Sequence, residues 1–323
     1  MVMQRMNWKV GLLMLLPLLF LGVAPSHAAE RMKPFELAST APGELAPVVA
    51  EVKQKLADGG FTIVGSYAPY TNVTFGDGEV VSAEILAVTS PALQKAAAAT
   101  STGGYAAVQR VSVTQVVDHG TSQVQVAWTN PSYMAHAYRL GTDLAEVTAA
   151  LGKTLGAQQA YGSARGLDAA ALEHYHYKVF MPYFTDADVL ASYASHEEAV
   201  SAVDAGLAAH RGGTGEVYRL ALPGTQQTVF GVALAGTDAN DCSGDRYIMS
   251  KIDFQPIKST AHLPYEVLVA GNKVYALPAK FRIAINFPDL SMMGSHSFVS
   301  IMCAPGAIKK ALAAAASGAK GAG

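Results

Sequence analysis

The sequence is short of charged residues and of cysteines, and each shortage limits what the protein can be. Charged residues make up 15% of the 323 positions, the formal net charge is −2, and hydrophobic residues make up 50%. No stretch gathers basic residues, which argues against nucleic acid as a partner. Such a composition is typical of a well-packed globular protein with a rather neutral surface.

Catalytic motifs are missing as well. The sequence has no Gly-x-Ser-x-Gly elbow, no P-loop and no Gly-x-Gly-x-x-Gly dinucleotide fingerprint. It also lacks a Cys-x-x-Cys-His motif, so covalent haem is excluded and the cofactor, if there is one, is unknown. These patterns do not indicate an enzyme, but a periplasmic enzyme with His174 or His296 as general base stays an alternative.

An export signal is predicted at the N-terminus. Arg5 and Lys9 precede an apolar run over 10–24, and small residues form a cleavage site near Ala28. We therefore expect residues 1–28 to be removed, which takes away two basic residues, changes the net charge from −2 to −4, and leaves a periplasmic or secreted protein. No later run approaches the roughly 20 apolar residues of a membrane span, so no transmembrane segment is expected after signal removal.

The two cysteines predict a disulfide. Cys242 and Cys303 both lie in the exported part of the chain, where thiols tend to oxidise. Closing a loop of that length would contribute about 4 kcal/mol by restricting the unfolded chain. Two buried free thiols and a thiolate metal site are the alternatives.

The pattern of elements predicts an α+β protein of two packed units. We expect a leader over 29–43, an N-terminal domain over 44–156, a linker over 157–166, a C-terminal domain over 167–316 and a flexible tail over 317–323. Each domain has an amphipathic helix that ends in Gly-Gly, then antiparallel strands, then a closing helix, which is the pattern of a tandem pseudo-repeat. Helices segregated from hairpins indicate sheets covered by helices on one face.

The clearest strand signals lie in the last third of the chain. Residues 265–269 and 273–276 predict a hairpin around Ala270-Gly271-Asn272, and 281–287 alternates as a half-buried strand would. A further strand is expected over 247–254. The segments TVFGVAL and LPYEVLVAGNKVYALPAKFRIAI resemble the sheet of the domain-of-unknown-function 302 family, over 226–304 and more loosely over 44–156. The resemblance implies a small α+β domain without an established activity, and no catalytic residues to transfer.

Two sets of residues are candidate metal ligands. His174 and His176, if they lie on a strand, present both imidazoles on one face, within reach of a single ion. Met293 and His296 combine thioether and imidazole, which suits copper, so copper or zinc is the metal to expect. The alternatives are histidines hydrogen-bonded to the backbone at an aromatic-rich junction, and methionines that fill gaps in the core.

Three further residues complete the candidate ligand site. We expect His262 and Arg282 to line a cleft beside the main hairpin, with surface positions as the alternative, and Tyr183 to lie at the domain junction. Because pockets often form at domain interfaces, the sequence favours an exported ligand-binding or accessory protein with a junction cleft. The ligand would be a metal ion, a small apolar molecule or a partner protein. A structural or assembly factor is the alternative from another class.

Overall fold

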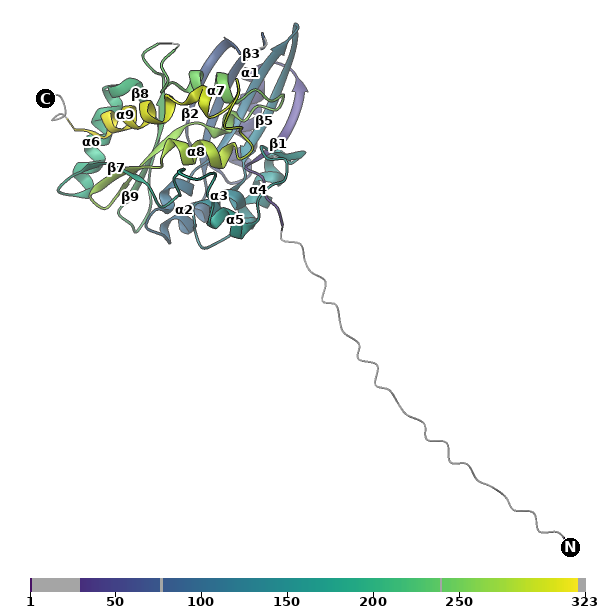
Figure 1. The fold of residues 1–323 in the computed structure, drawn as a ribbon, viewed down its shortest axis with the longest axis horizontal. Helices are drawn as coiled ribbons and strands as arrows, with labels where there is room; N and C mark the ends of the chain where they lie inside the picture. The colour runs from purple at the N-terminus through teal and green to yellow at the C-terminus, as the bar shows by residue number, and fades with distance from the viewer. Residues whose placement is uncertain (2–29, 76–77, 239, 319–323) are drawn as a thin grey trace.

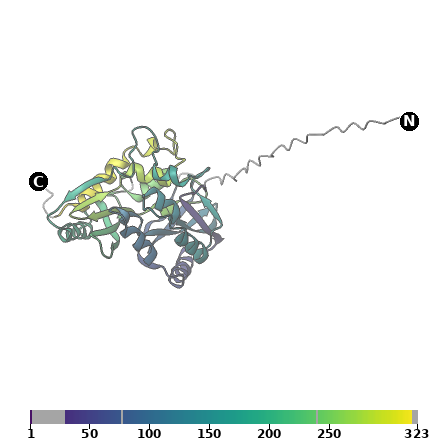
Figure 2. The same cartoon turned by 90° about the horizontal axis from the view of Figure 1, so that it is seen from below.

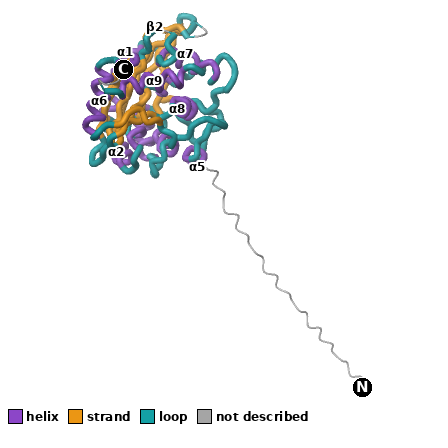
Figure 3. The backbone as a smooth tube through the Cα atoms, turned by 60° about the vertical axis from the view of Figure 1, so that its left-hand side comes forward, coloured by secondary structure: helices purple, strands orange, loops and turns teal. Residues whose placement is uncertain are grey.

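The computed structural model describes residue 1 and residues 30–75, 78–238 and 240–318. The predicted signal peptide falls outside this part of the chain. In the described residues, two antiparallel sheets lie inside the molecule and helices and loops surround them (Figures 1 and 3). This arrangement confirms the predicted α+β fold with two sheet units.

The first sheet has six strands in the order β2-β3-β4-β5-β1-β6. Its strands are β1 (Phe35–Pro42), β2 (Thr62–Thr74), β3 (Val80–Thr89), β4 (Gln109–Asp118), β5 (Thr121–Thr129) and β6 (Gln159–Tyr161). β1 lies where the sequence predicted an unstructured leader, and that prediction was wrong. Phe35 and Leu37 are buried, and β1 pairs with β5 on one side and β6 on the other.

The second sheet has five strands in the order β7-β11-β10-β9-β8. They are β7 (Asp188–Ser192), β8 (Thr214–Ala221), β9 (Gln227–Leu234), β10 (Tyr265–Ala270) and β11 (Lys273–Ala276). The predicted hairpin is confirmed, because Leu268 of β10 pairs with Tyr275 of β11.

The two sheets share one topology. Reading from β2 gives β2-β3-β4-β5-β1, and reading the second sheet from β8 gives β8-β9-β10-β11-β7, so each strand of the second sheet has a counterpart in the first. β6 has none. The similar plan of the two halves therefore extends to the strand order, and β6 is the strand by which the sheets differ.

Helices follow the same plan. The first half contains α1 (Leu45–Asp58), α2 (Pro91–Ala98), α3 (Pro131–Ala137), α4 (Ala145–Leu155), α5 (Ala169–Glu173) and the 3-10 helix η1 (Gly103–Ala106). The second half contains α6 (His196–Ala208), α7 (Asp245–Ile252), α8 (Ala279–Asn286), α9 (Ala304–Ala316) and the 3-10 helices η2 (Arg211–Gly213), η3 (Thr260–His262) and η4 (Val299–Ile301). α1 packs on β2, β3 and β4, while α6 and α9 pack on the second sheet (Figure 2).

Two predicted strands are helices. Residues 281–287 lie mostly in α8 and residues 247–254 mostly in α7. Seven of the eight residues of α8 are buried, including Arg282 and Asn286. A short segment that is buried over most of its surface shows no polar face with a period of 3.6, so the alternation of Phe281, Ile283 and Ile285 does not distinguish a strand from a helix.

The two units contact each other closely. β2 lies against β8, and a Cβ added at Gly65 would lie 2.0 Å from the carbonyl oxygen of Val217, so a side chain there would collide with the neighbouring strand. η1 of the first half packs on β9 and β10, and η3 of the second half packs on β3, β4 and β5. One hydrophobic core runs through both halves. Residues 157–166, expected to be a linker, contain β6.

A disulfide and close helix packing hold the C-terminal segment. Cys242 and Cys303 are bonded, with Cα atoms 5.9 Å apart, which confirms that prediction. The bond joins the loop before α7 to the start of α9. In the described part of the chain, Val299–Ala316 is the one helical stretch long and apolar enough to cross a membrane. Core helices pass the same test, and α9 packs against α6 and α8.

Candidate functional site

An ionic cluster lies in the core between the two sheets. Arg110 of β4 donates from Nη2 to Glu266 Oε1 of β10, and Arg282 of α8 donates from Nε to Glu266 Oε2 at 2.9 Å. All three side chains are buried. Two guanidinium groups thus share one carboxylate, and backbone carbonyls of His262 and Pro264 accept from Arg282 Nη2 at 2.9 and 3.0 Å.

His262 belongs to the same cluster as a neutral imidazole. Burial lowers the pKa of His262 well below its usual range, and the charges of Arg282 and Arg110 lower it further. Its Nδ1 lies 3.5 Å from Arg282 Nη1 and accepts from it, so Nε2 carries the proton and donates to the Tyr265 hydroxyl at 3.1 Å.

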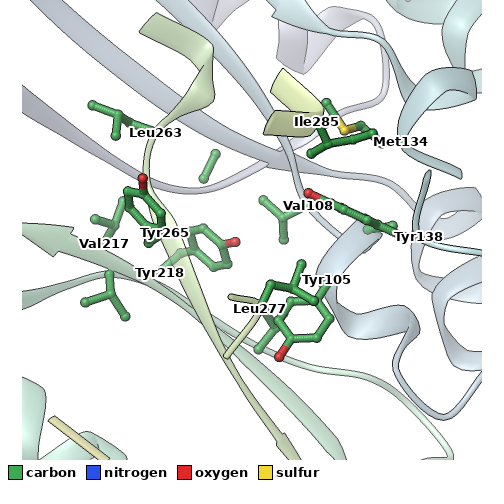
Figure 4. Packing of buried hydrophobic residues seen from close by; sticks show 14 of the residues in the cluster. Tyr105, Val108, Met134, Tyr138, Val217, Tyr218, Leu263, Tyr265, Leu277 and Ile285 are labelled. Carbon is green, nitrogen blue, oxygen red and sulfur yellow. The ribbon is translucent and has the colours of Figure 1, made fainter. Parts of the chain in front are cut away.

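The expected cleft at His262 and Arg282 is therefore not there. Both side chains are buried, and each has its hydrogen-bonding groups committed to the other or to Glu266 and Tyr265. Figure 4 shows Tyr265, with Tyr105, Tyr138 and Tyr218, among the aliphatic side chains of this core. The cluster is a buried ionic link between the units.

The first surface cavity lies where the units meet. We call it the junction chamber; its volume is about 510 Å³, and it lies between β6 with its neighbours and the segment 252–259 that follows α7. The apolar side chains on its wall are Tyr161, Ile252, Phe254, Ile257, Phe287 and Leu290. This volume is within the ~300–1,000 Å³ typical of small-molecule sites. The chamber depends on β6, the strand without a counterpart.

Asp253 is the one buried carboxyl group on the wall of this chamber within the described residues. Its Oδ1 accepts from the backbone N–H of Ser259 at 2.8 Å. Burial raises the pKa of Asp253 to about 7, against the lowering effects of that hydrogen bond and of Lys258. Burial therefore disfavours a negative charge on Asp253, while Asp289 is a second carboxyl group on the wall.

The second cavity adjoins the first and is basic. We call it the basic chamber; its volume is about 780 Å³, and it shares Ser163, Asp289 and Leu290 with the junction chamber. Three cationic residues line it, with one carboxylate against them. The cations are Arg31, Arg165 and Lys178, and the carboxylate is Asp289. The two chambers adjoin, and together we call them the junction groove.

His174 and His176 line the basic chamber, but not from a strand. His174 is the residue that ends α5, and His176 lies in the loop after it. His174 Nδ1 donates to the Ala170 carbonyl at 3.1 Å, and His176 Nε2 donates to the Met181 carbonyl at 2.8 Å. Because a carbonyl only accepts, the other nitrogen of each ring is left free to accept or to coordinate.

Tyr183 supports this loop and does not line either chamber. Its ring stacks on His176, with centroids 4.3 Å apart and planes at 11°. The stacking fixes the orientation of the imidazole, so Tyr183 acts on the chamber through His176.

The second pair of candidate metal ligands lies elsewhere. His296 Nδ1 donates to the Lys251 carbonyl at 2.8 Å and stacks on Phe254, while Met293 is 71% exposed. Neither lines the basic chamber with His174 and His176. Across residues 30–75, 78–238 and 240–318, no three or more His, Cys, Asp or Glu side chains are grouped to hold a metal ion. Copper or zinc binding stays a prediction.

The cations of the basic chamber were missed in the sequence. Arg31 comes from the segment before β1, Arg165 from the loop after β6, and Lys178 from the loop after α5. No local motif connects them, because the fold alone brings them to one cavity.

Comparisons of the chain with models of protein families, with curated proteins and with solved structures found no match. The resemblance of residues 226–304 to the domain-of-unknown-function 302 family stays a prediction.

Proposed function

We propose that the protein is an exported binding protein that holds a small organic ligand in the junction groove. The observation that carries this proposal is the junction chamber: an apolar cavity of ligand size between two units that are otherwise packed tightly. Apolar walls of this kind contribute affinity by removing ligand surface from water, about 25 cal/mol per Å² buried.

The buried His262 is committed to the ionic cluster, whereas His174 and His176 each donate to a backbone carbonyl and keep a second ring nitrogen free. The proposal of binding therefore rests on the junction chamber. An enzyme with a histidine general base and an assembly factor stay predictions, as does metal binding by His174 and His176.

A neutral fluorescent probe tests the proposal. N-phenyl-1-naphthylamine is apolar and uncharged, and it should bind the wild-type protein saturably at one site with enhanced emission. Ala164 is exposed and lines the junction chamber. Ala164→Trp should fill the chamber with the indole ring. The probe would then lose contacts with the wall that contribute about 1.4 kcal/mol or more to binding, so its affinity should fall at least about tenfold.

The matched control is Ala221→Trp. Ala221 is exposed on β8 and lines neither chamber, so this variant should bind the probe as the wild type does. Wild-type protein that does not bind the probe, or that binds it equally well after Ala164→Trp, would contradict the proposed function.

A further inference from the structure

The basic chamber differs in charge from the chain that contains it. Arg31, Arg165 and Lys178 line it with one carboxylate, Asp289, and Arg31 also pairs with Asp168 at 3.9 Å, so Arg165 and Lys178 supply the excess positive charge. The chain as a whole has a formal net charge of −2. A local excess of cations on an anionic protein attracts anionic ligands specifically to this place.

One of the cations holds the wall of the chamber in place. Arg31 donates from Nε to the Arg165 carbonyl at 3.0 Å and from Nη2 to the Gly166 carbonyl at 3.2 Å. Ser163 Oγ accepts from the N–H of Gly166 at 3.1 Å, which closes the loop on itself. The backbone that carries the Arg165 side chain is therefore fixed before any ligand arrives, which lowers the entropic cost of binding.

The other two cations are available. Within the described residues, the side chains of Arg165 and Lys178 form neither an ion pair nor a hydrogen bond, and both are exposed. Lys178 Nζ lies 5.7 Å from the centroid of the Tyr177 ring. This contact uses none of the three N–H donors of Lys178 in a conventional hydrogen bond. Arg165 and Lys178 can both donate to the oxygens of one anionic group.

The apolar chamber and the basic chamber adjoin each other. Ser163, Asp289 and Leu290 belong to both walls, and Asp289 is occupied as the acceptor of the Ala164 backbone N–H. A molecule that lies across this boundary would contact apolar side chains at one end and cations at the other.

We propose that the ligand is a free amphipathic organic anion, with its apolar body in the junction chamber and its anionic group between Arg165 and Lys178. This inference rests on the proposed function and adds the chemical class of the ligand. A carboxylate, sulfonate or phosphate on an aromatic or alkyl body has the chemistry required.

Two dyes with one skeleton test the inference. 8-Anilino-1-naphthalenesulfonate shares the aromatic body of N-phenyl-1-naphthylamine and adds a sulfonate. We expect the wild-type protein to bind the sulfonate about tenfold more tightly than the neutral dye, since hydrogen bonds to a charged group contribute about 1.5–3 kcal/mol. Added salt should weaken binding of the sulfonate dye alone.

A double variant locates the anionic group. Arg165→Gln with Lys178→Gln should weaken sulfonate binding about tenfold and leave the neutral dye unchanged. The control is Arg246→Gln with Lys310→Gln, which removes two exposed positive charges that line neither chamber and should change neither affinity.

Outcomes separate the two proposals. Equal affinities for both dyes, or sulfonate binding unchanged in the Arg165 and Lys178 variant, would overturn the amphipathic anion and leave the binding protein standing. Decanoate should displace the sulfonate dye and decanol should not. The protein could also sediment with phosphatidylglycerol vesicles and lose this property in the Arg165 and Lys178 variant. The anionic group would then belong to a membrane lipid, and the proposal of a free ligand would be overturned.

Discussion

Tyr133 and Tyr138 are both fully buried at α3, but only one of their hydroxyl groups is hydrogen-bonded. Tyr133 donates to the Ile285 carbonyl of α8 at 2.8 Å, whereas the Tyr138 hydroxyl has no partner among the described residues. A buried polar group without a partner keeps its full cost of leaving water. The two hydroxyls should therefore differ in their effect on the free energy of unfolding.

Removing each hydroxyl measures that difference. Tyr133→Phe should lower the free energy of unfolding by about 1 kcal/mol, and Tyr138→Phe should leave it unchanged or raise it by up to about 1 kcal/mol. Urea denaturation of the two variants and the wild type gives the comparison. A loss in Tyr138→Phe as large as in Tyr133→Phe would mean that a buried water or another group bonds that hydroxyl.

Two buried carboxyl groups make stability depend on pH. Burial raises the pKa values of Asp245 and Asp253 to about 7, and Asp245 Oδ2 accepts from the Leu234 N–H at 3.0 Å and from the Tyr67 hydroxyl at 3.1 Å. The unfolded chain releases these protons near pH 4. Between about pH 4 and 7 the folded protein thus binds more protons than the unfolded one, so its stability falls as pH rises.

Replacing both carboxyl groups should remove their contribution to the slope. Each group should lower the free energy of unfolding by up to about 1.4 kcal/mol per pH unit from about pH 5 to about pH 7, while the buried neutral His262 raises it as the pH increases to about 6.5. Asp245→Asn with Asp253→Asn should therefore have a more positive slope than the wild type in this range, measured by urea midpoints. Hydrogen bonds from Ser243 and Thr237 lower the pKa of Asp241 to about 2, so Asp241→Asn is the control that keeps the slope.

At the scale of elements, two helices approach each other closely where α6 crosses α9. A Cβ added at Gly206 would lie 1.8 Å from the carbonyl oxygen of Ala315, while one added at Gly152 of α4 would meet nothing nearer than 3.6 Å. Alanine favours a helix over glycine by about 1 kcal/mol at both positions. Whether Gly→Ala raises or lowers the free energy of unfolding therefore depends on the atoms next to the new methyl group.

The two glycines form a matched pair. Gly152→Ala should raise the free energy of unfolding by about 0.5–1 kcal/mol, and Gly206→Ala should lower it by about 2 kcal/mol or more because α9 must move. Chemical denaturation of both variants gives the two signs. Stabilisation by Gly206→Ala would mean that α6 and α9 are packed more loosely than the structure shows.

Sequence patterns located elements best where one face is polar. α1 and the hairpin of β10 and β11 were found because their buried residues follow the helical and strand periods. The sequence predicts a strand at α8 because most of this helix is buried, and it predicts no strand at β1 because the segment carries Pro, Ser and Thr without periodicity. The disulfide could be predicted because the expected mature chain has only two cysteines, and thiols of an exported protein tend to oxidise.

The site was less accessible to sequence reasoning than the fold. His174 and His176 were recognised by their spacing, and they do line a cavity. No sequence motif links Arg165 with Lys178. They line the same chamber because of the path that the chain takes after β6 and after α5. The sequence predicts His262 and Arg282 at a cleft beside the main hairpin, but both are buried, where Glu266 pairs with Arg282.

At the scale of the whole molecule, Arg110 and Glu266 occupy corresponding places in the two halves. Arg110 lies four residues after Ala106, the end of η1, and Glu266 lies four residues after His262, the end of η3. β4 and β10 are counterparts in the two sheets, so the ion pair joins equivalent positions.

This pairing has a consequence for any assembly of single halves. A symmetric dimer of the first half would bring Arg110 against Arg110 in the core, at a cost of several kcal/mol, whereas in a dimer of the second half each Glu266 would keep Arg282 as its partner. Only unlike halves give Arg110 its carboxylate. Covalent linkage of the two halves in one chain guarantees that Arg110 meets Glu266.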